Sequence, residues 1–321
     1  MIRERCVVVK RTYTKKQKKI MTIAAIVVVA VCLLVELIGM IPGIPFNGWS
    51  DVGIALGLKP PPVIPEGELE VHFLDMGNAD CILVRQGDKN MLIDAAEPDN
   101  REDIIRYLQR QGVQKLDLVI ATHPHADHIG AMFAVVEEFP IDRFVMSYVT
   151  EEATPTSNAY IRMLEALDTH NVAVEEAIPG TTYELGTARL QIVAPFEAVE
   201  DANDVSVVCR LTFGERSFLF TGDAGKKVEN QMLDSPYVLR SDVLKLSHHG
   251  SNSGNSERFL YEVMPQYAVI TCGEGNSYGH PHQEVMSRLK RQQIQSFRSD
   301  LHGTIVFKSD GQELTVITEK G

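Results

Sequence analysis

Three imidazoles and a carboxylate stand within six residues of one another in the segment THPHADHIG, which begins at Thr122. Histidine and aspartate are ligands for divalent metal ions, and three crowded rings without a ligand would leave their desolvation uncompensated. His123 and His125 are two residues apart in extended backbone, so their side chains point the same way and can hold one ion. Asp127 and His128, at the start of the next helix, can reach a second ion. The segment therefore predicts a two-metal site.

Two later segments place metal-capable side chains at the ends of apolar strands in the same way. Asp223 follows the strand in LFTGDAG, and His248 and His249 follow the strand in LKLSHHGS. An aspartate at a helix start is usually an N-cap, so TGD alone would be weak evidence. Ligand sites lie at the carboxyl ends of strands in α/β sheets, so three such strand ends favour one shared pocket.

The elements that must position these residues alternate between strands and helices from residue 68 onward. Period-2 alternation and turn residues predict strands, and 3.6-residue spacing predicts helices. Such alternation over about 250 residues predicts layered α/β packing. The expected strands are 69–75, 80–86, 90–95, 116–122, 188–194, 205–213, 217–222, 241–247, 266–272 and 303–308, and the expected helices are 101–112, 128–138, 158–169, 225–234, 255–263 and 282–291.

The N-terminal region has the pattern of a membrane anchor. Residues 20–41 contain a single charge, Glu36, and as a transmembrane helix they would span roughly 33 Å, enough for a hydrocarbon core of about 30 Å. By the positive-inside rule, the basic residues 1–19 form a cytoplasmic tail, and everything after residue 41 lies outside the cytoplasm. This predicts a single-pass protein of the cell membrane. A cleaved secretory signal is the alternative, although no clear small-x-small site follows the apolar run.

Charge and composition divide the chain further. Its net charge is −12, but residues 1–19 contribute +7, which leaves −19 for the remainder. Non-specific binding of nucleic acid depends on Lys and Arg, so this acidity argues against it. Residues 42–67 are rich in Pro and Gly and are expected to form a semi-rigid linker, which leaves 68–321 as the globular domain. The five cysteines contain no C-x-x-C pair, and we expect buried hydrophobic residues, not a disulfide framework.

Together these motifs resemble the metallo-β-lactamase fold, and specifically the branch found in ComEC-type competence proteins. The similarity rests on LIDA, HPHADHIG, TGD and LSHHGS in this order, and it is extended by FLDMGNAD (73–80), NDVS (203–206), GEGNSYGHP (273–281) and SDLHGT (299–304). It implies an αββα sandwich with two divalent ions, Zn²⁺ or Mn²⁺, in a cleft at one edge.

The resemblance also implies the ligands of both ions. Alternation along a strand does not decide between His248 and His249, but a ligand directly before a glycine is common in this fold and favours His249. His248 would then face the substrate. Asp94 in LIDA would support the ligands from behind. The implied ligands are His123 and His125 for the first ion, Asp127, His128 and His249 for the second, and Asp223 as the bridge.

The chain departs from the wider fold at the first metal. A third histidine usually completes that site, yet the only histidine between residues 128 and 223 is His170, at the end of a predicted surface helix. The ComEC-like branch has Asn-Asp here, so Asn203 is a predicted oxygen ligand and Asp204 a supporting residue. An oxygen ligand favours Mn²⁺ over Zn²⁺ more than a full histidine set would.

Two ions in such a cleft suit phosphoester hydrolysis. A metal-bound hydroxide is the expected nucleophile, and Asp127 is expected to orient it. His280 is the candidate general acid for the leaving oxygen. Phosphate oxygens are expected to accept hydrogen bonds from three loop residues, although such residues more often form turns: Ser251, Ser253 and Asn276.

Three functions are compatible with these patterns. The first is a phosphodiesterase or nuclease-like enzyme that acts outside the cytoplasm, with DNA as the substrate that the resemblance suggests. Because the domain is acidic, the second is an esterase acting on a small cell-envelope phosphoester of the phosphorylcholine or teichoic-acid type. The third is a metal-bound but non-catalytic module, which the altered first site favours. The membrane is the expected partner, and no protein partner is indicated.

Overall fold

A computed structural model describes residues 14–39, 52, 62–149, 154–196 and 201–320. The chain divides into two compact units, residues 1–61 and residues 62–321. Most of the predicted cytoplasmic tail (1–19) and most of the predicted linker (42–67) lie outside the described residues.

The first unit contains one long helix, α1 (Lys15–Gly39). Its apolar side chains are exposed, including Ile26 at 62% and Leu33 at 64%. Among the residues that the structure describes, no helix has the combined length and apolar character of a membrane span. The predicted span over 20–41, of which residues 40 and 41 lie outside the described part, therefore stays a prediction.

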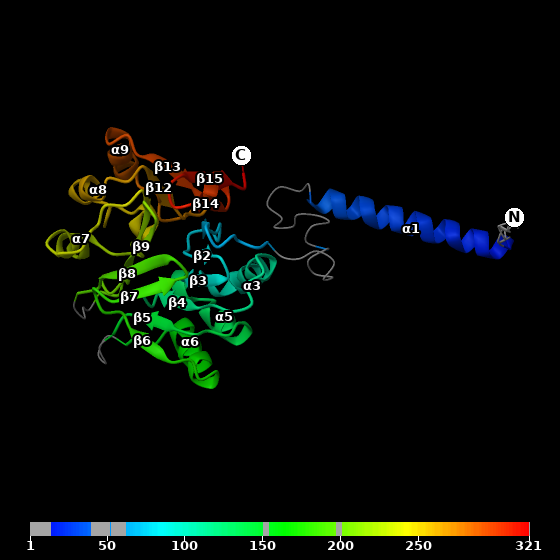
Figure 1. The fold of residues 1–321 in the computed structure, drawn as a ribbon, viewed down its shortest axis with the longest axis horizontal. Coiled ribbons are helices and arrows are strands. Elements are labelled where there is room, and N and C mark those ends of the chain that lie inside the picture. Colours follow the sequence, from blue (N-terminus) through cyan, green and yellow to red (C-terminus); the bar gives the residue numbers. More distant parts are fainter. Residues whose placement is uncertain (1–13, 40–51, 53–61, 150–153, 197–200, 321) are drawn as a thin grey trace, which may run out of the picture. The chain divides into compact units, whose positions relative to one another are not determined.

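The second unit is built on two β-sheets that pack face to face (Figure 1). The first sheet has eight strands in the order β15-β14-β1-β2-β3-β4-β5-β6, and the second has seven in the order β13-β12-β11-β10-β9-β8-β7. The strands are β1 (Leu69–Phe73), β2 (Ile82–Gln86), β3 (Lys89–Ile93), β4 (Leu118–Ala121), β5 (Phe144–Met146), β6 (Val174–Glu176), β7 (Thr182–Leu185), β8 (Ala188–Ala194), β9 (Val208–Phe213), β10 (Arg216–Phe220), β11 (Val243–Lys245), β12 (Tyr267–Ile270), β13 (Gln295–Arg298), β14 (Ile305–Ser309) and β15 (Leu314–Thr318).

Side chains of the central strands alternate between two environments. One set packs between the two sheets, and the other packs against the helices on the outer side of its own sheet. Phe218 and Phe220 of β10 face the other sheet, whereas Leu219 between them faces the helices behind its own sheet. In β3, Ile93 likewise faces the other sheet and Leu92 faces the helical side. These strands are apolar on both faces because both faces are covered.

Helices cover the outer side of each sheet (Figure 1). The short 3₁₀ and α-helical segments η1 (Pro98–Asn100), α4 (Ala126–Ile129), η2 (Ser247–Gly250) and α10 (Ser299–His302) lie in the connections. This arrangement confirms the predicted αββα sandwich. The first sheet is covered by α3 (Arg101–Arg110), α5 (Met132–Glu138) and α6 (Asn158–Thr169), and the second by α7 (Lys226–Leu233), α8 (Glu257–Val263) and α9 (Gln283–Arg291).

Several boundaries differ from the prediction for identifiable reasons. The predicted helix 128–138 is interrupted near Gly130, where an added Cβ would lie 2.3 Å from the Ala126 oxygen and 2.4 Å from Pro98. The predicted strand 241–247 is shorter because the chain turns into η2 after Lys245. The short strand β6 was missed because residues 174 and 176 are exposed and form no apolar pattern.

A polar network lies between β1 and α3. Neutral His72 accepts a hydrogen bond from the Tyr107 hydroxyl (2.7 Å) at Nδ1 and donates to Glu70 (3.0 Å) from Nε2. The ammonium of Lys308 lies 2.5 Å from the other oxygen of Glu70. Burial alone would raise the pKa of Glu70, but the contacts with His72 and Lys308 outweigh burial and lower this pKa to about 2.

This network predicts a specific acid sensitivity. Because folding lowers the pKa of Glu70 from 4.5 to about 2, its carboxylate stabilises the fold above pH 4.5, and that contribution is lost as the pH falls towards 2. The full contribution is at most about 3–4 kcal/mol. Urea denaturation of residues 62–321 at a series of pH values should show a shallower acid dependence for Glu70→Gln than for wild type. An unchanged slope would contradict this, and the exposed Asp103→Asn is the control.

Candidate metal centre

The predicted ligands meet where strands of both sheets end. His123, Asp127 and His128 follow β4, Asp223 follows β10, and His249 follows β11. Asp127, His128, Asp223 and His249 each offer one ligand atom, and these four atoms lie within 4.8 Å of one another.

His128 and Asp223 show most directly that this cluster fits a metal. Nε2 of His128 lies 3.2 Å from Oδ1 of Asp223, and the geometry of this contact is not that of a hydrogen bond. Both atoms are buried and lack a hydrogen-bond partner, whereas buried polar atoms almost always have one. Nitrogen and oxygen ligands at about 2.1 Å from a shared ion lie roughly 3 Å apart. The pair therefore has the spacing and the free lone pairs of two ligands of one divalent ion.

Asp94 holds the His128 ring in place. One carboxylate oxygen of Asp94 accepts a hydrogen bond from Thr122 N (2.8 Å), and the other lies 2.7 Å from both Thr122 Oγ1 and His128 Nδ1. Asp94 itself has a left-handed backbone, with φ 59°, which turns its side chain towards these partners. Its contacts are those of the predicted supporting residue, because a carboxylate on Nδ1 leaves Nε2 for the metal.

The residues predicted for the first ion are also close together. Nε2 of His123 lies 3.0 Å from Nδ1 of His125 and 3.8 Å from Oδ2 of Asp223. Burial lowers the pKa of His123 well below its ordinary value, so the ring is neutral at neutral pH and a lone pair is available. His125 is exposed at the rim. The first site is thus more open than the second, and its occupancy stays a prediction.

The two adjacent histidines take different positions. Both have left-handed backbones, with φ 50° at His248 and 52° at His249. Nδ1 of His249 donates to the Thr271 carbonyl (2.8 Å), and its Nε2 lies 3.3 Å from Asp127 Oδ2. His248 lies at the edge of the cluster, with Nε2 3.7 Å from Asp223 Oδ2 and its side chain 29% exposed. The geometry favours His249 as the ligand and leaves His248 facing outward.

The Asn-Asp segment lies beside the cluster. Oδ1 of Asn203 is buried without a partner, as a ligand oxygen would be before an ion binds. The same loop supports Asp223, whose backbone N–H donates to Ser206 Oγ (3.1 Å). Asp204 instead accepts a hydrogen bond from the backbone of Gly225, so it holds the start of α7. His170 is exposed at the C-terminal end of α6.

Two of the three residues predicted to contact phosphate already use their side chains in hydrogen bonds within the protein. Asn276 donates to the carbonyls of Gly273 (2.9 Å) and His280 (2.7 Å) and accepts from His280 N (2.9 Å), so its amide holds its own loop together. Ser251 is buried and accepts from Ser253 Oγ (3.0 Å). Ser253 is exposed and lies 3.3 Å from His248 Nδ1, which leaves it the best placed of the three to meet a substrate.

His280, the predicted general acid, lies beside the two adjacent histidines, and its role stays a prediction. Its ring centroid lies 5.5 Å from that of His248 and 6.1 Å from that of His249. Burial, reinforced by His249 and His248, lowers the pKa of His280 to about 4. The ring therefore carries no extra proton at neutral pH, and its buried Nδ1 has no partner.

Sequence reasoning missed two charged residues behind the cluster. Lys245, the last residue of β11, is fully buried, and its ammonium lies 2.8 Å from Asp80 Oδ2. The signals were a lysine inside the apolar run VLKLS and the aspartate that ends FLDMGNAD.

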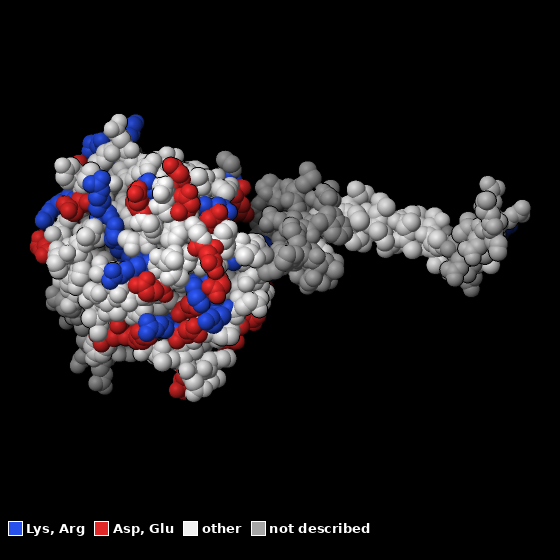
Figure 2. Space-filling view, viewed as in Figure 1, with Lys and Arg blue, Asp and Glu red and all other residues white. Residues whose placement is uncertain are grey.

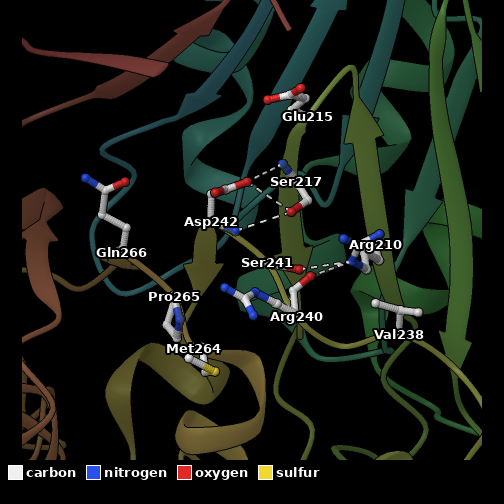
Figure 3. A pocket seen from close by; sticks show the side chains of 10 residues that line it. All are labelled: Arg210, Glu215, Ser217, Val238, Arg240, Ser241, Asp242, Met264, Pro265 and Gln266. Atoms are coloured by element: carbon white, nitrogen blue, oxygen red, sulfur yellow. Dashed lines mark hydrogen bonds between the residues drawn. The ribbon is translucent and has the colours of Figure 1, made fainter. Parts of the chain in front are cut away.

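A second cavity lies at the opposite end of the second sheet (Figure 3). Its volume is 410 Å³, and it is lined by residues that precede or begin the parallel strands, such as Ser217 and Gln266. Its polar groups bond to one another: Asp242 accepts from Ser217 N (2.8 Å), and Arg210 donates to the Arg240 carbonyl (2.9 Å).

The sandwich and the cluster at its edge define a metallohydrolase class. Residues 74–274 match the family model of the metallo-beta-lactamase superfamily. The chain belongs to this superfamily, as its motifs predicted.

Relatives of the chain include proteins named for competence. The chain is 30% identical to ComE operon protein 3 of Bacillus subtilis over 263 aligned residues. This alignment covers 75% of this chain and 33% of that protein. It is 29% identical over 287 residues to competence protein ComA of Neisseria gonorrhoeae, covering 88% and 38%. The chain thus spans about a third of the length of these relatives, and the ComEC-like resemblance is confirmed.

Solved structures share the fold. YhfI from Bacillus subtilis, a metallo-beta-lactamase fold protein, aligns with a TM-score of 0.50 at 15% identity, over 75% of this chain and all of that chain. CmlA, a diiron beta-hydroxylase from Streptomyces venezuelae, aligns with a TM-score of 0.53 at 14% identity, over 85% of this chain and 60% of that one. At these identities the likeness supports the fold alone.

The contacts of Asp94 lead to a prediction about metal affinity. Asp94→Asn keeps the shape of the side chain but removes the charge that orients His128, so we expect the affinity for Mn²⁺ or Zn²⁺ to fall about 10- to 100-fold. Isothermal titration calorimetry on residues 62–321 measures this affinity. Asp99→Asn, an exposed aspartate five residues away, should bind the metal like wild type. Equal affinities for both variants would show that Asp94 does not support the site.

Proposed function

We propose that the protein is a phosphodiesterase that depends on divalent metal ions. The observation that carries this proposal is the pair of unsatisfied buried atoms, His128 Nε2 and Asp223 Oδ1, inside a cluster with Asp127 and His249. When bound, ions held by such residues would lower the pKa of water and offset charge on phosphoryl oxygens. The ligand set is rich in oxygen if Asn203 takes part, which favours Mn²⁺.

The chain's own residues would orient the attacking water and contact the phosphate. Burial alone would raise the pKa of Asp127, but contacts with His249 and His128 hold it well below the ordinary value. Its carboxylate therefore remains ionised and can accept a hydrogen bond from an attacking water. His248 and Ser253, exposed at the edge of the cluster, are placed to contact the phosphate or the leaving group.

Charge and relatives favour different substrate classes. Competence relatives favour a nucleic-acid phosphodiester. Against this, residues 20–321 carry a net charge of −19, and Lys and Arg are intermixed with Asp and Glu on the face shown in Figure 2. Long nucleic acids bind through accumulated contacts between phosphates and basic side chains. A small cell-envelope phosphoester is therefore the second candidate, because a local metal pocket suffices to bind it.

Hydrolysis of bis(p-nitrophenyl) phosphate by residues 62–321 with Mn²⁺ or Zn²⁺ tests the reaction. Asp223→Ala removes the central ligand, and we expect at least a 1,000-fold loss of kcat/KM, or about 4 kcal/mol. His170→Ala alters an exposed histidine on α6 and should leave the rate unchanged. A metal-loaded wild type without turnover would favour the non-catalytic module instead.

Substrate panels separate the two enzyme candidates. Cleavage of single-stranded DNA that weakens steeply with added salt would favour a nuclease. Release of phosphorylcholine or glycerol phosphate units, with DNA left intact, would favour a cell-envelope substrate.

We also propose that the segment containing α1 holds the protein at the cell membrane, with its N-terminus in the cytoplasm and the hydrolase outside it. The apolar run 20–41 with its single charge, the exposed apolar side chains of α1 and the basic residues before it support this.

Fractionation of cells tests the membrane proposal. The full-length chain should sediment with carbonate-washed membranes, and deletion of residues 1–41 should release the hydrolase into the soluble fraction. Deletion of residues 2–13 alone removes charge but keeps α1, so this variant should stay with the membranes. Soluble full-length protein would contradict the proposal.

A further inference from the structure

Beneath the metal ligands lies an ion pair that the hydrolytic mechanism does not use. Lys245 shares its strand face with Val243, which belongs to the core between the sheets, so the lysine side chain also points between them. It is fully buried, and its ammonium lies 2.8 Å from Asp80 Oδ2 and donates to the Leu246 carbonyl (2.9 Å). Asp80 is 1% exposed and comes from the loop before β2 in the other sheet.

Asp80 contacts the candidate ligands on the side away from the metal. Its carboxylate oxygens lie 3.5 Å from His249 Nδ1 and 4.0 Å from His128 Nδ1, whereas the Nε2 atoms of both rings face the cluster. Its backbone N–H donates to the Asp127 carbonyl (3.0 Å). Its side chain also accepts a hydrogen bond from the Thr271 hydroxyl, and the carbonyl of Thr271 accepts from His249. One aspartate thus reaches three of the four clustered residues.

Stability alone does not explain such a pair. Taking two charges out of water costs more than most buried pairs regain, and well-packed neutral residues of similar volume are often equally stable. A fixed carboxylate behind a ligating imidazole, by contrast, orients the ring and increases its basicity.

We propose that Asp80 and Lys245 form a positioning pair for the metal centre. Asp80 holds His249 from behind through Thr271 and places a negative charge behind the His128 ring that Asp94 orients, and Lys245 fixes Asp80. The inference rests on the metal-binding part of the proposed function and is independent of the substrate. It predicts that metal affinity and coordination, not folding, depend on the pair.

The informative variant removes both charges together. Asp80→Asn/Lys245→Met keeps the volume and leaves no unpaired buried charge, so the full-length protein should fold with a melting temperature near that of wild type. We expect its affinity for Mn²⁺, measured by isothermal titration calorimetry, to fall about 10- to 100-fold. The visible absorption spectrum of the Co²⁺-loaded protein, which reports ligand geometry, should also shift.

A matched pair elsewhere controls for general effects of removing buried charges. Glu70→Gln/Lys308→Met removes the ion pair on β1 and β14 and should leave Mn²⁺ affinity and the Co²⁺ spectrum unchanged. A folded Asp80→Asn/Lys245→Met protein with wild-type affinity and spectrum would overturn the proposal. If that variant does not fold, Thr271→Val decides: it deletes only the hydroxyl that donates to Asp80, and an unchanged affinity for Mn²⁺ would also overturn it.

The measurement separates this inference from the proposed function. A wild-type protein that binds Mn²⁺ but does not hydrolyse phosphodiesters would contradict the proposed phosphodiesterase activity. The role of Asp80 and Lys245 would still be decided by the metal affinity of their double variant. A wild-type protein that binds no divalent ion contradicts both.

Discussion

A buried polar atom without a hydrogen-bond partner is costly, and two such atoms of the described residues lie 3.2 Å apart, on His128 and Asp223. Each residue is fixed from its other side, His128 by Asp94 and Asp223 by Ser206. The strand ends of both sheets therefore converge on two atoms whose lone pairs are left free. The surrounding hydrogen bonds hold the His128 ring in place, and a bound cation would satisfy these two atoms.

The backbone carries a second cost at the same place. Asp94, His248 and His249 all have positive φ without being glycine, a conformation that costs roughly 1–3 kcal/mol per residue. Each is held by contacts around it: Asp94 by Thr122, and His249 by the Thr271 carbonyl. Other described residues, such as Asn171 after α6 and Gln293 after α9, also have positive φ, but at Asp94, His248 and His249 this conformation places side chains at the cluster.

The sequence allowed much of this to be predicted, for physical reasons. The ligand cluster followed from motifs that combine an apolar strand with polar residues at its end, as at His123 and Asp223. Alternating strand and helix patterns predicted layered α/β packing, and the sandwich followed from the family resemblance that the motifs carry. Short or half-exposed strands such as β6 carry no such pattern and were missed. Asp80 and Lys245 were missed because their roles depend on a contact between sheets 165 positions apart in the chain, which spacing does not reveal. The pKa of His280 depends likewise on its packing.

The order in which the ligands occur along the chain has a further consequence. His128 and Asp94 belong to the first half of the domain, whereas Asp223 and His249 belong to the second. During synthesis the nascent chain cannot complete the four-residue cluster until His249 has left the ribosome. Binding of an ion by all four residues would therefore be a late event, and that ion would connect two halves of the polypeptide that were made at different times.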